Sequence, residues 1–166
     1  MAARPKRSTS DVIVAAGARL LRSRRLMRAP IWLYRARLGF LFGSRMLLLE
    51  HIGRKSGATR RVVLEVFDNP EPGTYVVVSG FGSRAQWFRN VRAEPRVRVR
   101  ISGNAPASAT ARLLTTEEAD RALARYAEEH PRAWARFKPV VEATLGSTIS
   151  ERDTELPMVA LTLGAR

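Results

Sequence analysis

After residue 44, apolar positions form short runs or alternate with polar ones, and turns rich in Gly, Pro, Asn and Asp separate them. Such runs, with many β-branched side chains, are typical of strands. In residues 96–101 the alternation is strict, with three arginines on one face and Val and Ile on the other. Residues 107–113 alternate similarly, and we expect the alanines and Leu113 to face inward. The pattern predicts six strands, at residues 45–52, 61–67, 75–79, 96–101, 107–113 and 156–163.

Three segments have helical spacing instead. Residues 84–93 carry bulky apolar side chains at that spacing and end at a Glu-Pro pair. Thr115 and Glu118 form a capping box, which predicts a helix from there to about residue 129. Pro131 begins a further helix that reaches about residue 145.

The connections between the predicted strands are short, which favours antiparallel neighbours. Residues 68–73 and 102–104 have the composition of turns. A sheet of this size tends to close because closure removes exposed edges. We therefore predict a mainly β protein with flanking helices (α+β), built on a six-stranded antiparallel barrel in residues 45–166.

The first 44 residues form a separate basic arm. Residues 1–45 hold eleven Lys and Arg against one acidic residue, Asp11, whereas the rest of the chain is close to neutral. Residues 11–27 can form an amphipathic helix, and residues 31–42 form a second short segment rich in aromatic side chains. Basic helices with apolar faces bind anionic membrane surfaces, but such helices also cover a barrel or a subunit interface. The pattern leaves both interpretations open.

Composition excludes several classes of site. The chain of 166 residues has no cysteine, so it has no disulfides, thiolate metal sites or thiol catalysis. Its two histidines, His51 and His130, lie in no metal-binding motif, so we expect no metal and assign both a structural or surface role. No apolar run is long enough to span a bilayer, and no signal peptide is apparent, so the expected location is the cytoplasm, with the inner membrane face as an alternative for the arm.

One turn concentrates the candidate chemistry. Residues 53–61 read Gly-Arg-Lys-Ser-Gly-Ala-Thr-Arg-Arg, with four cations and two glycines between two predicted strands. Guanidinium groups, an ammonium group and glycine-exposed backbone N–H groups bind phosphates and carboxylates. Residues 79–82 (Ser-Gly-Phe-Gly) and 86–90 (Gln-Trp-Phe-Arg-Asn) add a second turn and a helix that could hold a flat polar molecule. The combination predicts a site for an anionic, aromatic cofactor.

These motifs, in this order and followed by Ala-Glu-Pro-Arg-Val-Arg-Val, resemble the deazaflavin (coenzyme F-420)-dependent nitroreductase family over residues 47–118. The resemblance implies a split β-barrel, of the fold of the flavin-binding (FMN-binding) pyridoxamine oxidase-like proteins. It also implies an 8-hydroxy-5-deazaflavin coenzyme with an acidic tail. The cofactor-binding residues that it implies are Arg54, Lys55, Ser56, Arg60, Arg61, Val62, Val63, Leu64, Ser79, Gly80, Phe81, Gly82, Gln86, Trp87, Phe88 and Asn90.

The implied reaction is hydride transfer from the reduced coenzyme to a hydrophobic electrophile: an activated alkene, enone, quinone or nitro compound. Ser79, Tyr126 or solvent would supply the proton. The family's nitroimidazole-reducing members often have Ser-Lys-Gly-Gly in the closing turn, where this chain has Ser-Gly-Phe-Gly, so one cation is missing. They also place tyrosines before the last strand, where this chain offers Trp134, Phe137 and Val141, which predicts an apolar substrate pocket.

Two other classes are compatible with the sequence. Proteins of this fold also hold FMN, haem or fatty acids, because fold does not fix function. The basic composition, with a pI of about 11.6, and the arginine face of residues 96–100 are typical of nucleic-acid binders. No nucleic-acid-binding motif accompanies that charge, so we do not expect nucleic acid as a partner. Monomer and homodimer are both left open.

Overall fold

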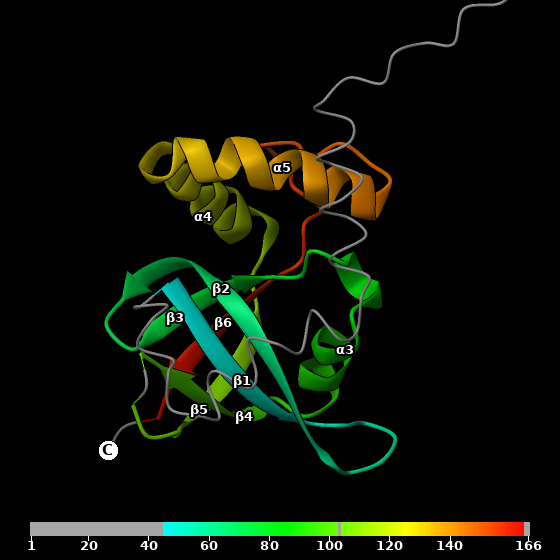
Figure 1. The fold of residues 1–166 in the computed structure, drawn as a ribbon, viewed down its shortest axis with the longest axis vertical. Coiled ribbons are helices and arrows are strands. Elements are labelled where there is room, and N and C mark those ends of the chain that lie inside the picture. Colours follow the sequence, from blue (N-terminus) through cyan, green and yellow to red (C-terminus); the bar gives the residue numbers. More distant parts are fainter. Residues whose placement is uncertain (1–44, 103, 165–166) are drawn as a thin grey trace, which may run out of the picture.

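The computed structural model describes residues 45–102 and 104–164; the predicted arm of residues 1–44 lies outside them. Six strands form one closed barrel in the order β1-β2-β3-β6-β5-β4, with every neighbouring pair antiparallel (Figure 1). The strands are β1 (Met46–Ile52), β2 (Thr59–Glu71), β3 (Thr74–Val78), β4 (Arg96–Ile101), β5 (Ala107–Leu113) and β6 (Met158–Leu163). The predicted fold class is confirmed.

Helix α3 (Gln86–Ala93), preceded by the 3₁₀ turn η3 (Gly82–Arg84), lies at one end of the barrel (Figure 1). Its Trp87, Phe88 and Val91 are buried and join the barrel core together with residues such as Leu47 and Val99. Burial of side chains of this size stabilises the fold by roughly 1.5–3 kcal/mol each. The apolar side of α3 is thus part of the barrel core.

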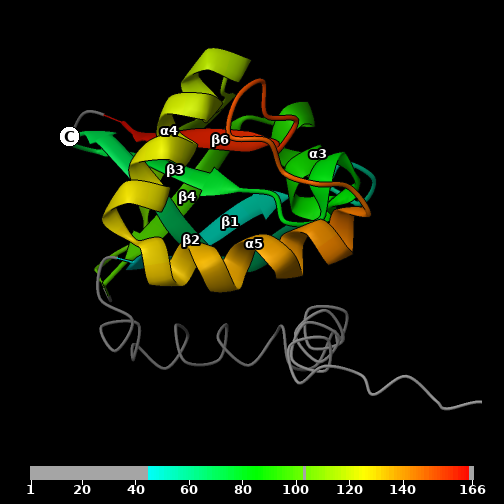
Figure 2. The same ribbon diagram turned by 90° about the horizontal axis from the view of Figure 1, so that it is seen from above.

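Helices α4 (Thr116–Glu129) and α5 (Pro131–Leu145) form a second layer over the barrel (Figures 1 and 2). A second core lies between these helices and the outer side of the sheet, where it includes Phe67, Leu123 and Met158. The predicted capping box at Thr115 and Glu118 is present, with each side chain bonded to the other residue's backbone N–H. Within the described residues, no helix is long and apolar enough to cross a membrane.

Two details of the predicted pattern are wrong. Strand β2 continues through the predicted turn to Glu71, with register shifts between Val66 and Glu71, and the chain reverses at Pro72 and Gly73. Bulges let a strand continue past a residue such as Pro70 that cannot donate a ladder hydrogen bond. Leu113, expected inside, is 40% exposed because it occupies the last position of β5, at the end of the barrel.

Candidate active site at the β1–β2 turn and helix α3

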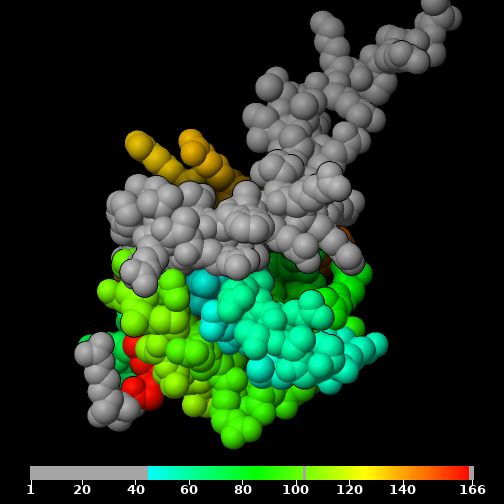
Figure 3. All heavy atoms as spheres, turned by 60° about the horizontal axis from the view of Figure 1, so that its bottom comes forward, coloured from blue at the N-terminus to red at the C-terminus, as the bar shows by residue number. Residues whose placement is uncertain are grey.

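The turn between β1 and β2, residues 53–58, projects beyond the barrel beside α3 (Figure 1) and lies on the molecular surface (turquoise in Figure 3). The Gly53 N–H donates to the Ala58 carbonyl at 2.9 Å, and the Gly57 N–H donates to the Gly53 carbonyl at 2.8 Å. Gly57 has φ +65°, where a side chain is strained. A Cβ at Gly53 would lie 2.9 Å from the Ser56 hydroxyl oxygen. The two glycines therefore allow this tight turn.

Arg54 on this turn is held against α3. Its backbone N–H donates to Asn90 Oδ1 at 3.2 Å, and its Nη1 donates to Asn90 Oδ1 and to Gln86 Oε1, both at 3.0 Å. Gln86 and Asn90 are four residues apart in a helix, so they share one face. A guanidinium has five N–H donors, and these contacts use the two on Nη1. The Nε and Nη2 edge can still make a bidentate contact with an anion.

Asn90 is also bonded to His51, the next-to-last residue of β1. Asn90 Nδ2 lies 3.2 Å from His51 Nδ1, and the two side chains are 5% and 4% exposed. The pKa of His51 is lowered to about 4, mainly because burial disfavours the charged ring; a backbone hydrogen bond at Ile52 opposes this decrease, and the positive charge of Arg60 adds to it. His51 is therefore neutral at physiological pH.

The cations of the turn differ from other arginines in how their charge is balanced. Within residues 45–102 and 104–164, salt bridges to carboxylates are made by Arg45, Arg61, Arg96, Arg112 and Arg125. Arg54 contacts neutral amides instead, and Arg60 Nη2 makes a long contact of 3.5 Å with the Ser56 hydroxyl. The turn thus presents positive charge that no described carboxylate compensates, which is the property that an anion-binding site needs.

Strand β2 places its predicted site residues in different surroundings. Arg61, on the exposed side, donates to Glu50 Oε1 at 2.7 Å, so a carboxylate already balances its charge. Val62 and Leu64 pack against the barrel core, and Val63 pairs with Leu48 in the ladder to β1. Of the four, the exposed Arg61 has the side chain that is most accessible to a ligand.

The closing turn, residues 79–82, packs against α5. Ser79 is fully buried, and its hydroxyl donates to the Gly82 carbonyl at 2.7 Å. A Cβ at Gly80 would lie 3.8 Å from Val141, and one at Gly82 would lie 3.0 Å from Leu145. Phe81 is partly buried against the barrel core. The hydroxyl of Ser79 therefore stabilises the turn itself.

The predicted substrate-pocket residues lie in the second core. Trp134 and Val141 are 7% and 1% exposed, and Phe137 packs beside the rings of Trp134 and Tyr126 at centroid distances of 6.1 and 6.4 Å. Of the three, Val141 is the one brought next to the closing turn, at Gly80.

Tyr126 is the second predicted proton donor. It stacks on Phe67, with ring centroids 3.8 Å apart, and its hydroxyl donates to Glu65 Oε1 at 3.0 Å. Burial and the charge of Glu65 raise the pKa of Tyr126 to about 12. Glu65 also accepts from Arg45 at 3.0 Å. In this arrangement the tyrosine donates its proton to a half-buried carboxylate.

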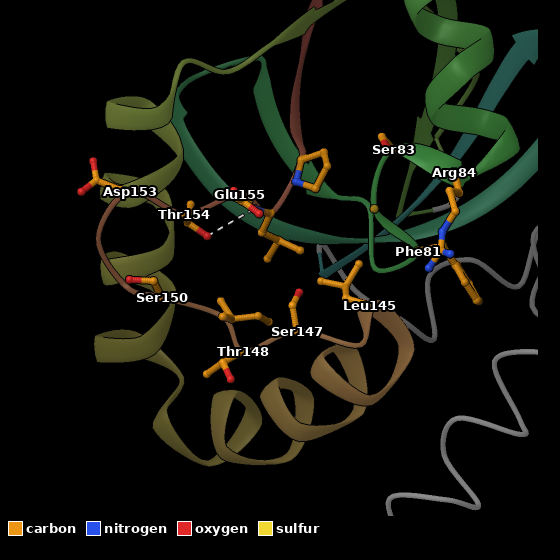
Figure 4. Close-up of a pocket in the computed structure, with 14 residues that line it drawn as sticks. Phe81, Ser83, Arg84, Leu145, Ser147, Thr148, Ser150, Asp153, Thr154 and Glu155 are labelled. Atoms are coloured by element: carbon orange, nitrogen blue, oxygen red, sulfur yellow. Dashed lines mark hydrogen bonds between the residues drawn. The ribbon is translucent and has the colours of Figure 1, made fainter.

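A cleft of about 520 Å³ opens beside the closing turn. Phe81 and Arg84 lie on one side of it, and the loop after α5, residues 147–155, lies on the other (Figure 4). Leu145 and Leu156 contribute apolar surface, and several Ser and Thr side chains contribute hydroxyls. The sequence pattern gave no indication of this cleft, because residues 146–155 have no regular apolar spacing.

Comparison with known proteins identifies the family. Residues 26–161 match the family model described as F420H(2)-dependent quinone reductase. The chain belongs to this family. It is therefore a deazaflavin-dependent reductase whose cofactor is coenzyme F-420, as the sequence motifs indicated, and the turn and helix that carry those motifs are in contact in the fold.

Solved structures share the barrel of this reductase. One described as an F420-H2 dependent reductase is 26% identical, with a TM-score of 0.50, over 70% of this chain and 93% of the other. The haem storage protein HutZ from Vibrio cholerae is 12% identical, with a TM-score of 0.51, over 80% of this chain and 90% of its own. The second likeness concerns the fold alone. A comparison with curated proteins gave no match.

Proposed function

We propose that this reductase binds the acidic end of coenzyme F-420 on a cationic turn, namely the β1–β2 turn with Arg54 and Lys55 together with Arg60 at the start of β2, and that it transfers a hydride from the coenzyme to a quinone. The binding mode is supported by the charges of Arg54, Lys55 and Arg60, which form no salt bridge with a described carboxylate. Helix α3 also orients Arg54 through Gln86 and Asn90. A phosphate and a chain of carboxylates would replace water on these cations through charge-assisted hydrogen bonds. The residues present therefore fit this coenzyme.

The reduced deazaflavin, when bound, supplies a hydride. The protein must then hold the coenzyme and its acceptor in the orientation that hydride transfer requires, and it must exclude water. We propose that Gly80, Phe81 and Gly82 border the reacting face, with Val141 and Leu145 behind them as apolar support. The absence of a side chain at Gly80 and Gly82 lets Val141 and Leu145 of α5 pack closely against the back of this turn.

The proton that completes reduction would come from solvent. Ser79 already donates its hydroxyl proton to Gly82, and Tyr126 donates to Glu65 with a pKa raised to about 12. Both hydroxyls would have to break an internal bond before they could act as acids. Water that reaches the cleft beside the closing turn needs no such step.

A quinone is the acceptor that we favour, in keeping with the name of the matched family. Two conjugated carbonyl groups make its ring carbons electrophilic, and its flat apolar ring suits the surroundings of Phe81 and Leu145. Enones and nitro compounds are acceptors of the same type. We further propose that the basic arm contacts anionic membrane surfaces, next to the apolar bilayer interior in which quinones dissolve.

The test is single-turnover oxidation of the reduced coenzyme without oxygen. Menadione, cyclohexenone and a nitroimidazole would each be mixed with the protein and reduced coenzyme F-420, and the recovered fluorescence of the oxidised coenzyme would be followed. We expect menadione to react fastest, by at least about tenfold, because it is the strongest hydride acceptor of the three. Binding of the coenzyme without oxidation by menadione would contradict the quinone proposal.

A further inference from the structure

Two buried neutral side chains, His51 and Asn90, join the end of β1 to α3 directly behind Arg54. We propose that they are positioning residues, which fix the orientation of the Arg54 guanidinium so that its Nε and Nη2 edge faces the coenzyme's acidic group. This inference rests on the proposed function of the cationic turn. The resemblance to the family implies that Asn90 contacts the cofactor directly. The present inference instead places Asn90 behind the cofactor-binding surface, as a support for Arg54.

The hydrogen-bond inventory of Asn90 supports this assignment. Its Oδ1 has two lone pairs and accepts two bonds from Arg54, one from the backbone N–H and one from Nη1. Its Nδ2 is then the group that faces His51 Nδ1 at 3.2 Å. With the amide turned over, its NH₂ group would face two donors. The contacts with Arg54 therefore determine which way the Asn90 side chain points.

That orientation also determines the tautomer of His51. Because Asn90 Nδ2 donates, Nδ1 of the imidazole must accept, and its proton must be on Nε2. A protonated imidazole would present a donor to a donor. The burial of His51 and the nearby charge of Arg60 both favour the neutral ring. In the series of hydrogen bonds from His51 through Asn90 to Arg54, every donor thus faces an acceptor.

Neutral acceptors have a further consequence for Arg54. A carboxylate would orient a guanidinium equally well, as Glu118 orients Arg112 at 2.8 and 2.9 Å, but it would also cancel the charge. The amides of Asn90 and Gln86 hold Arg54 without cancelling it. Held in one orientation, the guanidinium loses less side-chain entropy when an anion binds. Orientation without neutralisation is what a cationic binding residue requires.

A double-mutant cycle on coenzyme binding tests the proposal. The dissociation constant of oxidised coenzyme F-420 would be measured by fluorescence for Arg54→Ala, Asn90→Ala and the double variant. If Asn90 acts through Arg54, Asn90→Ala weakens binding about three- to tenfold, the value of one or two hydrogen bonds, and the double variant binds no more weakly than Arg54→Ala. Additive losses would mean that Asn90 contacts the coenzyme itself, and would overturn the proposal.

The control cycle pairs Asn90→Ala with Arg60→Ala. Arg60 belongs to the same cationic surface but contacts Ser56, and no described contact joins it to Asn90. We expect these two losses to add. Coupling as strong as that between Asn90 and Arg54 would indicate a general distortion of the turn and would count against specific positioning.

A second measurement needs no coenzyme. The nitrogen chemical shifts of the His51 imidazole, read by NMR, report its tautomer in the wild-type protein, and we expect the proton on Nε2. In binding, His51→Gln should stay within about threefold of wild type, because a side-chain carbonyl can accept from Asn90, whereas His51→Leu should lose about as much as Asn90→Ala. A proton on Nδ1 overturns the positioning network. Failure of the wild-type protein to bind coenzyme overturns the proposed function instead.

Discussion

At the scale of single residues, the chemical character of each partner decides what a charged or polar group can do. Arg54 and Arg61 are both exposed arginines near the same turn, but Glu50 balances the second and neutral amides orient the first. Surface salt bridges contribute little to stability, about 0–1 kcal/mol. Their effect on ligand binding is larger, because a compensated guanidinium attracts an anion less strongly.

Gly82 supports a prediction about the closing turn. It has φ +60°, and a Cβ there would lie 3.0 Å from Leu145. Gly82→Ala should destabilise the protein by about 2–3 kcal/mol, through backbone strain and the displaced Leu145. Gly146→Ala is the matched control, since Gly146 has φ +78° but nothing lies within 4 Å of the added carbon. Urea unfolding should show a smaller loss for the control, and equal losses would contradict the contact.

His51 makes stability depend on pH. Its folded pKa is about 4, below its ordinary value of 6.5, so the unfolded chain takes up a proton first as pH falls. Stability should therefore be complete above pH about 6.5 and decrease toward pH about 4, by at most about 3 kcal/mol. Exposed carboxylates such as Glu94, whose pKa the hydrogen bond from Arg96 lowers to about 2, lose their contribution to stability at lower pH than His51 does.

Chemical unfolding of wild type and His51→Gln at several pH values measures this dependence. His130 is present in both proteins, so the difference between their pH profiles belongs to His51. The variant should have the flatter profile between pH 6.5 and 4. Parallel profiles would show that the buried imidazole does not titrate in this window.

At the scale of elements, α4 offers a local test. Its capping box joins Glu118 N–H to the Thr115 hydroxyl at 3.3 Å and Thr115 N–H to the Glu118 carboxylate at 2.9 Å. Thr115→Ala should lower the free energy of unfolding by about 1 kcal/mol. Thr116→Ala, one residue later on the exposed first turn, should change it by less than about 0.5 kcal/mol. Equal effects in urea unfolding would argue that the cap contributes nothing.

The sequence predicts elements well where local pattern and burial agree. The strict alternation of residues 96–101 and the capping box at Thr115 both correspond to elements at those positions. Strand β2 was predicted too short because Asn69 and Pro70 are typical of turns. Its pairing with β3 continues past them through shifts in register, which depend on a second strand and cannot be read locally.

The candidate site, too, was predictable only where local sequence motifs specify it. Local motifs identified the cationic turn, the closing turn and the polar face of α3. The bond between Arg54 and Asn90 joins positions 36 residues apart, and no local pattern specifies it. The same holds for His51, whose partner across the fold is 39 residues away. Trp134 and Phe137 would have the same helical spacing whether they lined a substrate pocket or packed in a core, so spacing alone does not distinguish the two.

At the scale of the whole molecule, a closed barrel fixes the relative positions of distant turns. Helix α3 is anchored in the barrel core through Trp87 and Phe88, so its polar face is held firmly beside the β1–β2 turn. Helix α5 in turn supports the closing turn at Gly80 and Gly82. A reductase that must align a coenzyme with its acceptor benefits from such rigid supports.

The most direct measurement is a fluorescence titration of oxidised coenzyme F-420 into wild-type protein, Arg54→Ala, Lys55→Ala and Arg61→Ala. If uncompensated charge on the turn binds the coenzyme, the first two variants should bind at least about tenfold more weakly, since hydrogen bonds to charged groups contribute about 1.5–3 kcal/mol. Arg61→Ala, whose charge Glu50 balances, should stay within about twofold of wild type. Equal affinity in all four proteins would contradict the assignment of this turn as the coenzyme site.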